Sequence, residues 1–307
     1  MERLAMISRS GEGDSDNDTL KDYEVQQEFW EYIEEHINAY KVSNPFPPTL
    51  NDDSSSSLSS SQNETLTNIL LMLRKLREGV LASHRVDSFA VGVYETSVSV
   101  AIYCQEDKAL SSIFGRLVPE LYDLHEDAEL AAAFLYLLTT KPRGQKLSSP
   151  LRQRTPSRDD YTAVYLLHLL VTGYPSQRDF LLRSKVLLMR TSPHFQLVAA
   201  TAANIRQGNY WALAQLVLHC LPTRNDLIQR MMVAILAKTR QRTWATLKVA
   251  YVQLQLDHRH WLCSALGFEK TTSVQKFMAE RVKRGEVMEK EGKEPTWTIV
   301  KAAKGKT

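Results

Sequence analysis

The chain has 307 residues, 43% of them hydrophobic, which suffices for one large or two modest domains with a substantial core. Its formal net charge is only +3, but residues 1–66 hold 4 Lys/Arg against 14 Asp/Glu, and residues 224–307 hold 17 against 8. This asymmetry favours a nucleic-acid or acidic-protein partner for the basic end, with plain solvation of two charged surfaces as the alternative.

Composition also argues against a secreted or membrane-spanning protein. The first residues lack the apolar core of a secretory signal, and no run approaches the ~18 apolar residues of a membrane span. Cys104, Cys220 and Cys263 lie far apart in apolar helical segments, and their number is odd. That pattern fits reduced, buried thiols rather than a disulfide framework, so we expect an intracellular protein.

Residues 1–65 predict an acidic, Ser/Pro-rich and largely disordered region with one amphipathic helix. Residues 1–20 are acidic and rich in Ser and Gly, a composition typical of disorder. A helix is expected over Tyr23–Tyr40, and Ser43–Thr65 indicates a linker. The apolar side chains near one face of that helix are Val25, Phe29, Tyr32 and Ile33.

Residues 66–223 have helical periodicity in almost every segment. Asp87 or Ser88 is a plausible N-cap of the second helix, and Lys141–Asp160 is a basic Pro/Ser segment that indicates an exposed loop. The helices expected before and after this loop cover Leu66–His84, Asp87–Asp107, Ala109–Leu124, Asp127–Thr140, Tyr161–Gly173 and Ser176–Arg190.

A short break in residues 194–217, "HFQLVAATAANIRQGNYWALAQLV", predicts a helical hairpin. Only "RQGN" separates two apolar runs, which is the length of a turn between antiparallel helices. We expect Gly208 to adopt the left-handed conformation that ends the first helix, and Trp211 to be buried against neighbouring helices. Because several such helix pairs follow one another without a strict period, the sequence favours an irregular TPR/PCI-like helical solenoid.

Residues 224–307 indicate a winged-helix module with a basic tail. Asn225–Leu256 predicts one long helix or two, and a short helix capped by Asp257 follows. The next helix, over Thr271–Gly285, has Thr272 as its expected cap. Strands are expected only between about Gly285 and Val300. One buried stripe of the long segment would hold Trp244, Leu247, Tyr251 and Leu254; another, in the later helix, would hold Val274, Phe277, Met278 and Val282.

An irregular helical stack followed by a winged helix resembles the PCI superfamily, and most closely its GANP-type mRNA-export scaffolds with their leukocyte-receptor-cluster relatives. Arg85–Asp107 is similar to the family's helix with Val-Tyr-Glu, and Asn204–Val217 to its Gly-Asn-Tyr hairpin. Leu227–Glu269 resembles its long helix followed by a short one ending Leu-Gly-Phe. One departure is that Arg74, Lys75 and Arg77 remain where many members continue to Asp-Leu, but the Asp-Leu is missing.

The resemblance implies a mainly α scaffold that pairs with a second PCI protein through adjacent winged helices. It also implies a small acidic DSS-type peptide held by the helices, weak RNA binding without sequence specificity, and a nuclear location with shuttling to the cytoplasm as an option. No membrane partner is implied.

Residue patterns typical of catalysis or metal binding are weak. His258, His260 and Cys263 have a possible metal spacing but lack a second pair, so solvated histidines and a buried thiol are favoured. Adjacent His219 and Cys220 would point about 100° apart on a helix, which argues against a nucleophile and its base. Without a phosphate loop or hydrolase motif, we expect no catalytic residues, no metal and no cofactor.

Basic side chains near the C-terminus are the candidate RNA- or partner-binding residues. Lys276, Lys283 and Arg284 are expected off the apolar stripe of their helix, where they would neutralise phosphates without reading sequence. Lys290 and Lys293 would lie on the wing, and Lys301, Lys304 and Lys306 follow the last strand. Glu286, Glu289, Glu291 and Glu294 dilute this charge, so a solvated protein-binding face is an equal alternative. Trp211, Trp244, Trp261 and Trp297 are expected in the core rather than as base-stacking platforms.

Taken with the resemblance, these features predict a non-catalytic scaffold subunit of a nuclear mRNA processing or export complex. The alternative within the same fold is a protein-only scaffold of a proteasome-lid, signalosome or translation-initiation-factor type. A subunit of a nucleic-acid enzyme is a third interpretation, against which the missing motifs argue.

Overall fold

A computed structural model describes residues 19–44, 60–139, 156–220, 225–256, 261–268, 270–290 and 295–300. The described residues are mainly helical, with one small antiparallel sheet, and this confirms the predicted mainly α class. They form two compact units, one ending at Tyr165 and the other starting at Leu166. The division therefore falls within a helix. The domain boundaries expected after residues 65 and 223 stay predictions.

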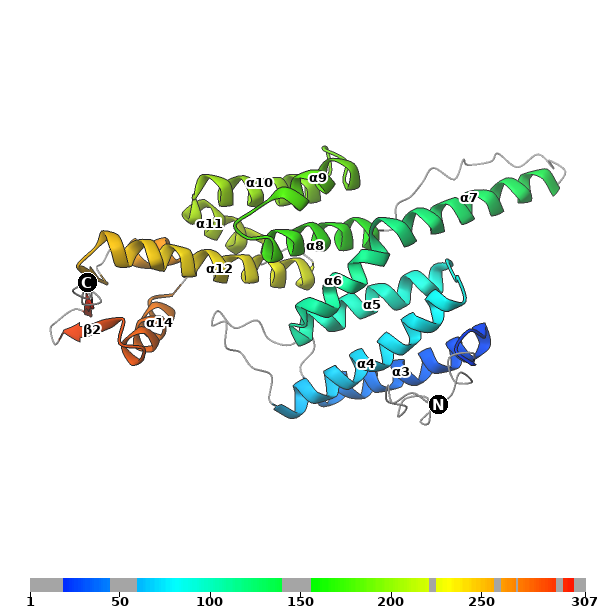
Figure 1. Ribbon diagram of the computed structural model, residues 1–307, viewed down its shortest axis with the longest axis horizontal. Coiled ribbons are helices and arrows are strands. Elements are labelled where there is room, and N and C mark those ends of the chain that lie inside the picture. Colours follow the sequence, from blue (N-terminus) through cyan, green and yellow to red (C-terminus); the bar gives the residue numbers. More distant parts are fainter. Residues whose placement is uncertain are drawn as a thin grey trace, which may run out of the picture. The chain divides into compact units, whose positions relative to one another are not determined.

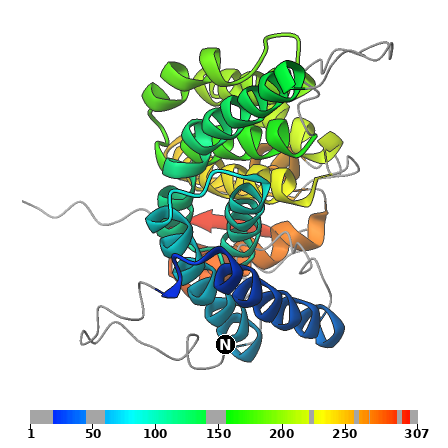
Figure 2. The ribbon, with the colours of Figure 1, turned by 90° about the vertical axis from the view of Figure 1, so that its right-hand side faces the viewer.

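The first unit begins with helix α3 (Tyr23–Ser43), which packs against α4 (Ser60–Ala82) (Figure 1, Figure 2). Phe29 and Ile33 of α3 are fully buried, as the amphipathic pattern predicted, and the neutral Gln26 is buried with them. Val25 and Tyr32 are only partly buried. The acidic helix therefore contributes to the core of the first unit.

After α4 the first unit continues through α5 (Ser88–Cys104), α6 (Asp107–Arg116), a π-helical turn η1 (Leu117–Leu121), α7 (Tyr122–Thr139) and the start of α8 (Pro156–Thr172). Asp87 is the N-cap of α5, because its Oδ1 accepts a hydrogen bond from the Ala90 backbone N–H at 3.0 Å. The predicted third helix is interrupted at Val118, which has extended dihedral angles.

Two segments predicted as a linker and a loop end earlier than expected, because the helix after each of them begins sooner. The linker over Ser43–Thr65 was placed too far along the chain, because α4 already begins at Ser60. The loop over Lys141–Asp160 was also too long, because α8 begins at Pro156. Residues 45–59 and 140–155 lie outside the described residues.

The second unit continues from α8 into a stack of α9 (Arg178–Leu187), α10 (Pro193–Gln207), α11 (Tyr210–Cys220) and α12 (Asp226–Ala250). Gly208 ends α10 with φ 66°, as predicted, and its N–H donates to the Ile205 carbonyl at 3.2 Å. The Oδ1 of Asn209 then accepts from the Ala212 N–H at 3.1 Å and caps α11. The hairpin is thus closed by backbone and cap contacts within a few residues.

The predicted burial of Trp211 is wrong, because 56% of its surface is exposed. On α11 the buried face is formed by Leu213, Ala214 and Val217. At about 100° per residue, Trp211 projects well away from the centre of that face. The apolar run therefore contains one large aromatic side chain that no described element covers.

The C-terminal end of the second unit contains β1 (Gln253–Gln255), α13 (Trp261–Leu266), α14 (Thr271–Lys283), β2 (Val287–Lys290) and β3 (Thr296–Ile299). The sheet is antiparallel with strand order β1-β3-β2, and Leu254 of β1 lies opposite Trp297 of β3. We call α12 to β3 the C-terminal module. Its core includes Trp244, Leu254, Leu262, Val274, Met278, Val287, Trp297 and Ile299.

Three predictions for this module need correction. Strand β1 lies outside the expected range for strands, because α12 ends at Ala250 and the chain becomes extended. Tyr251 therefore leaves the helical stripe and is exposed, and Leu254 reaches the core from a strand. Thr272 is not a cap, because Lys270 occupies the N-cap position of α14 without a side-chain bond. Asp257 lies outside the described residues.

Candidate nucleic-acid interface

Helix α14 carries the predicted basic side chains on the side that faces away from the core. Val274, Met278 and Arg281 are its buried residues, and Phe277 and Val282 are partly buried. Lys276 and Lys283 are exposed and seven residues apart, which places them on one face two helical turns apart. Of the other candidates, Arg284 follows the helix and Lys290 ends β2, both exposed, while Lys293, Lys301, Lys304 and Lys306 lie outside the described residues.

One acidic residue reduces the positive charge of this face. Glu280 lies on α14 and forms an ion pair with Arg284. Both side chains are about half exposed, so the pair contributes little to stability and remains open to solvent. The exposed basic side chains at this face are therefore Lys276, Lys283 and Arg284, with Glu280 among them.

Glu286 does not dilute the basic face, contrary to the sequence-based interpretation. Its carboxylate accepts from Trp244 Nε1 at 2.5 Å and lies 3.1 Å from Lys248 Nζ and 3.3 Å from Arg281 Nη1. Burial would raise the pKa of Glu286, but the hydrogen bonds from Trp244 and Lys248 and the charges of Arg281 and Lys248 together lower it. The carboxylate thus stays ionised and ties α14 to α12.

Arg281 is part of the same internal contact rather than of the exposed face. Its guanidinium carbon lies 4.5 Å from the ring centroid of Phe277 and 5.7 Å from that of Trp244. Stacked on two aromatic rings and paired with Glu286, it holds α14 at a defined rotation. That rotation presents Lys276 and Lys283 to solvent.

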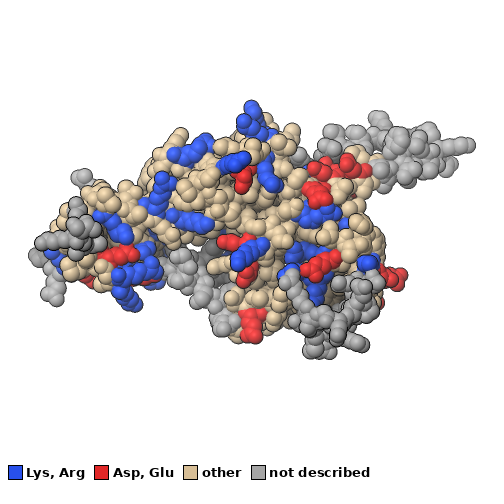
Figure 3. Space-filling view, viewed as in Figure 1, with Lys and Arg blue, Asp and Glu red and all other residues tan. Residues whose placement is uncertain are grey.

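A second basic surface lies on the helical stack, where the sequence analysis did not place a site. Residues 174–256 hold 11 Lys/Arg and only two Asp/Glu. Figure 3 shows Lys and Arg predominating over α9 to α12. The charge of residues 174–256 taken together reveals this surface. The sequence comparison began at residue 224, in the middle of this stretch, so the basic residues were not seen as one group. The exposed cations are Arg178, Arg183, Lys185, Arg190, Arg206 and Arg242.

Helix α9 also exposes large apolar side chains beside these cations. Leu182 and Val186 are 66% and 81% exposed, and Leu181 and Met189 are exposed as well. Only Phe180 and Ser184 of α9 are buried. Single exposed apolar residues are common, but Leu182 and Val186 lie one helical turn apart on the same side of α9, and such a pair suits a protein-binding surface.

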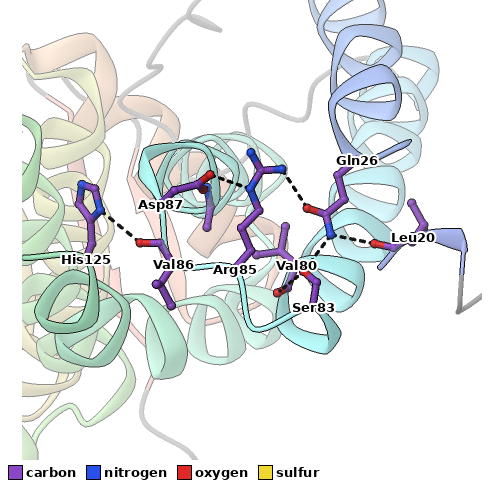
Figure 4. A network of polar contacts seen from close by, with 9 residues as sticks. Leu20, Gln26, Val80, Ser83, Arg85, Val86, Asp87 and His125 are labelled. Carbon is purple, nitrogen blue, oxygen red and sulfur yellow. Dashed lines mark hydrogen bonds and ion pairs between the residues drawn. The ribbon is translucent and has the colours of Figure 1, made fainter. Parts of the chain in front are cut away.

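In the first unit, the residues that carry the family resemblance have structural roles. Figure 4 shows Arg85 between Asp87 and Gln26: Nε donates to Asp87 Oδ2 at 2.8 Å and Nη1 donates to Gln26 Oε1 at 3.1 Å. Gln26 Nε2 donates in turn to the Leu20 carbonyl at 2.8 Å and to Ser83 Oγ at 2.9 Å. These bonds attach α3 to the turn between α4 and α5.

The Val-Tyr-Glu segment of α5 is likewise explained by packing. The guanidinium carbon of Arg77 lies 5.7 Å from the ring centroid of Tyr94, and Glu95 Oε1 accepts from the Tyr122 hydroxyl at 2.7 Å. A cavity of about 220 Å³ lies nearby, between α3, α4 and α5. It is lined mainly by apolar and tyrosine side chains, among them Tyr40, Leu66, Ile69, Val100 and Tyr103.

The described cysteines, Cys104 and Cys263, are both buried. Burial, and to a smaller extent Glu106, raises the pKa of the Cys104 thiol to about 12, and burial raises that of Cys263. Within the described ranges, no three His, Cys, Asp or Glu side chains come together as metal ligands would. His258, His260 and the side chains of His219 and Cys220 are not described. Among the described helices, none is both long and apolar enough to cross a membrane.

Comparison with protein-family models gives no match, and no curated protein matches the sequence. The family resemblance therefore depends on the order of the motifs quoted above. Interpretation of the basic surfaces depends on their own geometry and charge.

Proposed function

We propose that this chain is a non-catalytic scaffold subunit of a nuclear complex that processes or exports messenger RNA, and that it binds RNA and a second PCI protein. The proposal joins the family resemblance to the arrangement of the C-terminal module. A small acidic DSS-type peptide belongs to the same proposal as a further partner of the helices.

We infer that the C-terminal module is a winged helix. Support comes from its element order, helix, strand, helix, helix and hairpin, and from its strand order β1-β3-β2. In this interpretation α13 and α14 form the helix-turn-helix, and the β2–β3 hairpin forms the wing. Helix α14 then occupies the position from which such modules contact nucleic acid.

The observation that carries RNA binding is the exposure of Lys276 and Lys283 on one face of α14, opposite its buried stripe. Lysine is a point charge that contacts phosphates and carries no base specificity by itself. The inward rotation of Glu286 leaves this face more basic than the sequence suggests. Binding should therefore be weak, dependent on salt and insensitive to RNA sequence.

A protein-only scaffold of the proteasome-lid, signalosome or initiation-factor type is the second candidate. The exposed Leu182 and Val186 on α9 favour it, because an uncovered apolar patch suits a protein partner. The two candidates differ in what the basic face of α14 contacts, and this difference can be measured.

The test replaces Lys276, Lys283 and Arg284 together by Glu and measures binding to single-stranded RNAs of two unrelated sequences. A matched control replaces the exposed Lys21, Lys41 and Lys108 of the first unit by Glu, so that the net charge changes equally. We expect only the first variant to weaken binding to both RNAs alike. Each lost phosphate contact should remove about 0.7 from the slope of log affinity against log salt.

Two other results would change the assignment. Unchanged RNA binding with loss of a PCI partner would favour the protein-only scaffold. If neither RNA nor partner binding changes, the charge on α14 serves solvation alone and the proposed interface is wrong.

A further inference from the structure

The turn between α10 and α11 exposes an aromatic side chain that the fold does not need for packing. Trp211 is 56% exposed, whereas Trp244 and Trp297 are 3% and 2% exposed. An added Cβ at Gly208 would meet no atom within 4 Å, so the turn beside Trp211 is also open to solvent. A large flat ring is therefore presented next to a closed, well-capped turn.

Arginines from two other helices lie at the same end of the stack. Gln177, just before α9, donates from Nε2 to the Ala202 carbonyl of α10 at 2.8 Å and accepts from Arg206 Nη1 at 3.1 Å. These bonds place the first turn of α9, and with it the exposed Arg178, against the last turns of α10. Arg178 and Arg206 are thus close to the turn that carries Trp211.

The third arginine comes from α12. Helix α12 packs against α11 and begins only a few residues after it, so the start of α11 lies beside the second half of α12. Arg242 is exposed on that half of α12. Burial raises the pKa of Tyr210, the residue before Trp211, and the charge of Arg242 opposes that rise. Sequence positions 178, 206, 211 and 242 are separated along the chain, and the stack brings them to one end.

The local charge selects the ligand. Residues 174–256 contain only two acidic side chains, Asp179 and Asp226, and Asp226 is paired with Arg230 at 2.7 Å. Trp, Tyr and Arg also predominate in protein-binding hot spots, so the residue types alone do not decide the partner. A surface with so little negative charge favours a polyanion over a protein of mixed charge.

The geometry points to a second RNA site, in which Trp211 stacks on an unpaired base while Arg178, Arg206 and Arg242 contact the flanking phosphates. Single-stranded RNA fits because a base must leave its helical stack before an indole ring can cover it. This site rests on the proposed function in assuming that the chain binds RNA, but it uses none of the α14 residues.

The test measures affinity for a single-stranded RNA and for a duplex RNA of the same sequence, using the full chain. We expect Trp211→Ala to weaken single-strand binding about 30-fold, the middle of the range for loss of one base–aromatic stack. Trp211→Phe should retain part of the affinity. Duplex binding and the salt slope should be unchanged in both, because stacking releases no counterions. Leu182→Ala, which removes an exposed apolar side chain of α9, is the matched control and should have no effect.

The arginine arm is tested separately. Arg206→Glu with Arg242→Glu should weaken single-strand binding and flatten its salt slope, and circular dichroism should remain that of the wild type. The Lys276, Lys283 and Arg284 variant separates the two sites. If it loses RNA binding while Trp211→Ala does not, the second site is wrong and the α14 interface stands.

The converse result, loss with Trp211→Ala alone, would place RNA on the stack and overturn the α14 interface. If the wild-type chain binds neither RNA, both assignments are wrong. If Trp211→Ala abolishes binding of a PCI partner and leaves RNA affinity unchanged, the turn is a protein-binding hot spot and the inference is overturned.

Discussion

The α10–α11 turn and the α13–α14 turn have the same glycine conformation but opposite surroundings. Gly208 and Gly267 both have φ 66°. An added Cβ would meet nothing within 4 Å at Gly208, but at Gly267 it would lie 2.9 Å from Leu236 Cδ1 and 3.2 Å from Ala214 Cβ. The backbone conformation is a local property that both sequences signal, whereas the space around it depends on which helices pack there.

The aromatic residues near the two turns show the same contrast. Trp211 projects into solvent, while Trp244 is buried and donates to Glu286 within the C-terminal module. Both lie in helical segments rich in apolar residues. An apolar run therefore identifies side chains that could be buried. Whether they are buried depends on a second element of the fold packing against them.

The largest expected effect comes from the buried tryptophan of the sheet. Trp297→Ala should lower the free energy of unfolding of the second unit by about 3–5 kcal/mol, because it leaves a large cavity beside Leu254. Trp211→Ala should change it by less than about 0.5 kcal/mol, as for an exposed position. Chemical denaturation of both variants gives the comparison, and equal losses would contradict the two environments.

The two glycines give the next largest difference. Gly208→Ala should lower the free energy of unfolding by about 1 kcal/mol, because the only strain is that of an alanine in the left-handed conformation. Gly267→Ala adds a clash with Leu236 and Ala214 and should cost roughly 1–3 kcal/mol more, the usual range for overpacking. Denaturation midpoints of the two variants test this prediction. If Gly267→Ala loses no more stability than Gly208→Ala, then α11 and α12 can move away from the added methyl group at little cost.

Two arginines two residues apart on α12, and therefore on opposite sides of the helix, sharpen the contrast further. Arg240 donates to the Leu266 carbonyl at 2.8 Å and the Gly267 carbonyl at 3.2 Å, and its guanidinium lies 3.7 Å from the Phe268 ring centroid. Arg240→Ala should destabilise the second unit by about 2 kcal/mol, because buried carbonyls lose their donor. Arg242→Ala is the exposed control, and thermal unfolding should show almost no change.

The smallest effect is a pH dependence carried by Glu286. The pKa of Glu286 is lower in the folded chain than its ordinary value of 4.5. At pH values above 4.5, the ionised carboxylate therefore stabilises the folded state. This contribution is present at neutral pH and is lost as the pH falls through that value toward the lowered folded pKa. Glu286→Gln should reduce stability at neutral pH and flatten the acid side of the stability curve, measured by denaturant titration at successive pH values. If stability falls with decreasing pH as steeply in the variant as in the wild type, other carboxylates cause that fall.

Local signals in the sequence were sufficient for the helical class, the Asp87 cap, the left-handed Gly208 and the buried faces at Phe29–Ile33 and Val274–Met278. Each depends on residues within one or two helical turns, where capping, glycine conformation and amphipathic spacing act directly. The exposure of Lys276 and Lys283 followed from the same spacing, because they lie opposite an apolar stripe.

Only the tertiary structure decided the features that depend on distant partners. Extended backbone at Leu254 is stabilised by pairing with Trp297, more than forty residues away, so helical periodicity in its own segment was misleading. Glu286 faces inward because Trp244, Lys248 and Arg281 converge on it. Arg206 and Arg242 come to the end of the stack that holds Trp211 because α10 packs against α11 and α11 against α12, and no spacing along the chain encodes that arrangement.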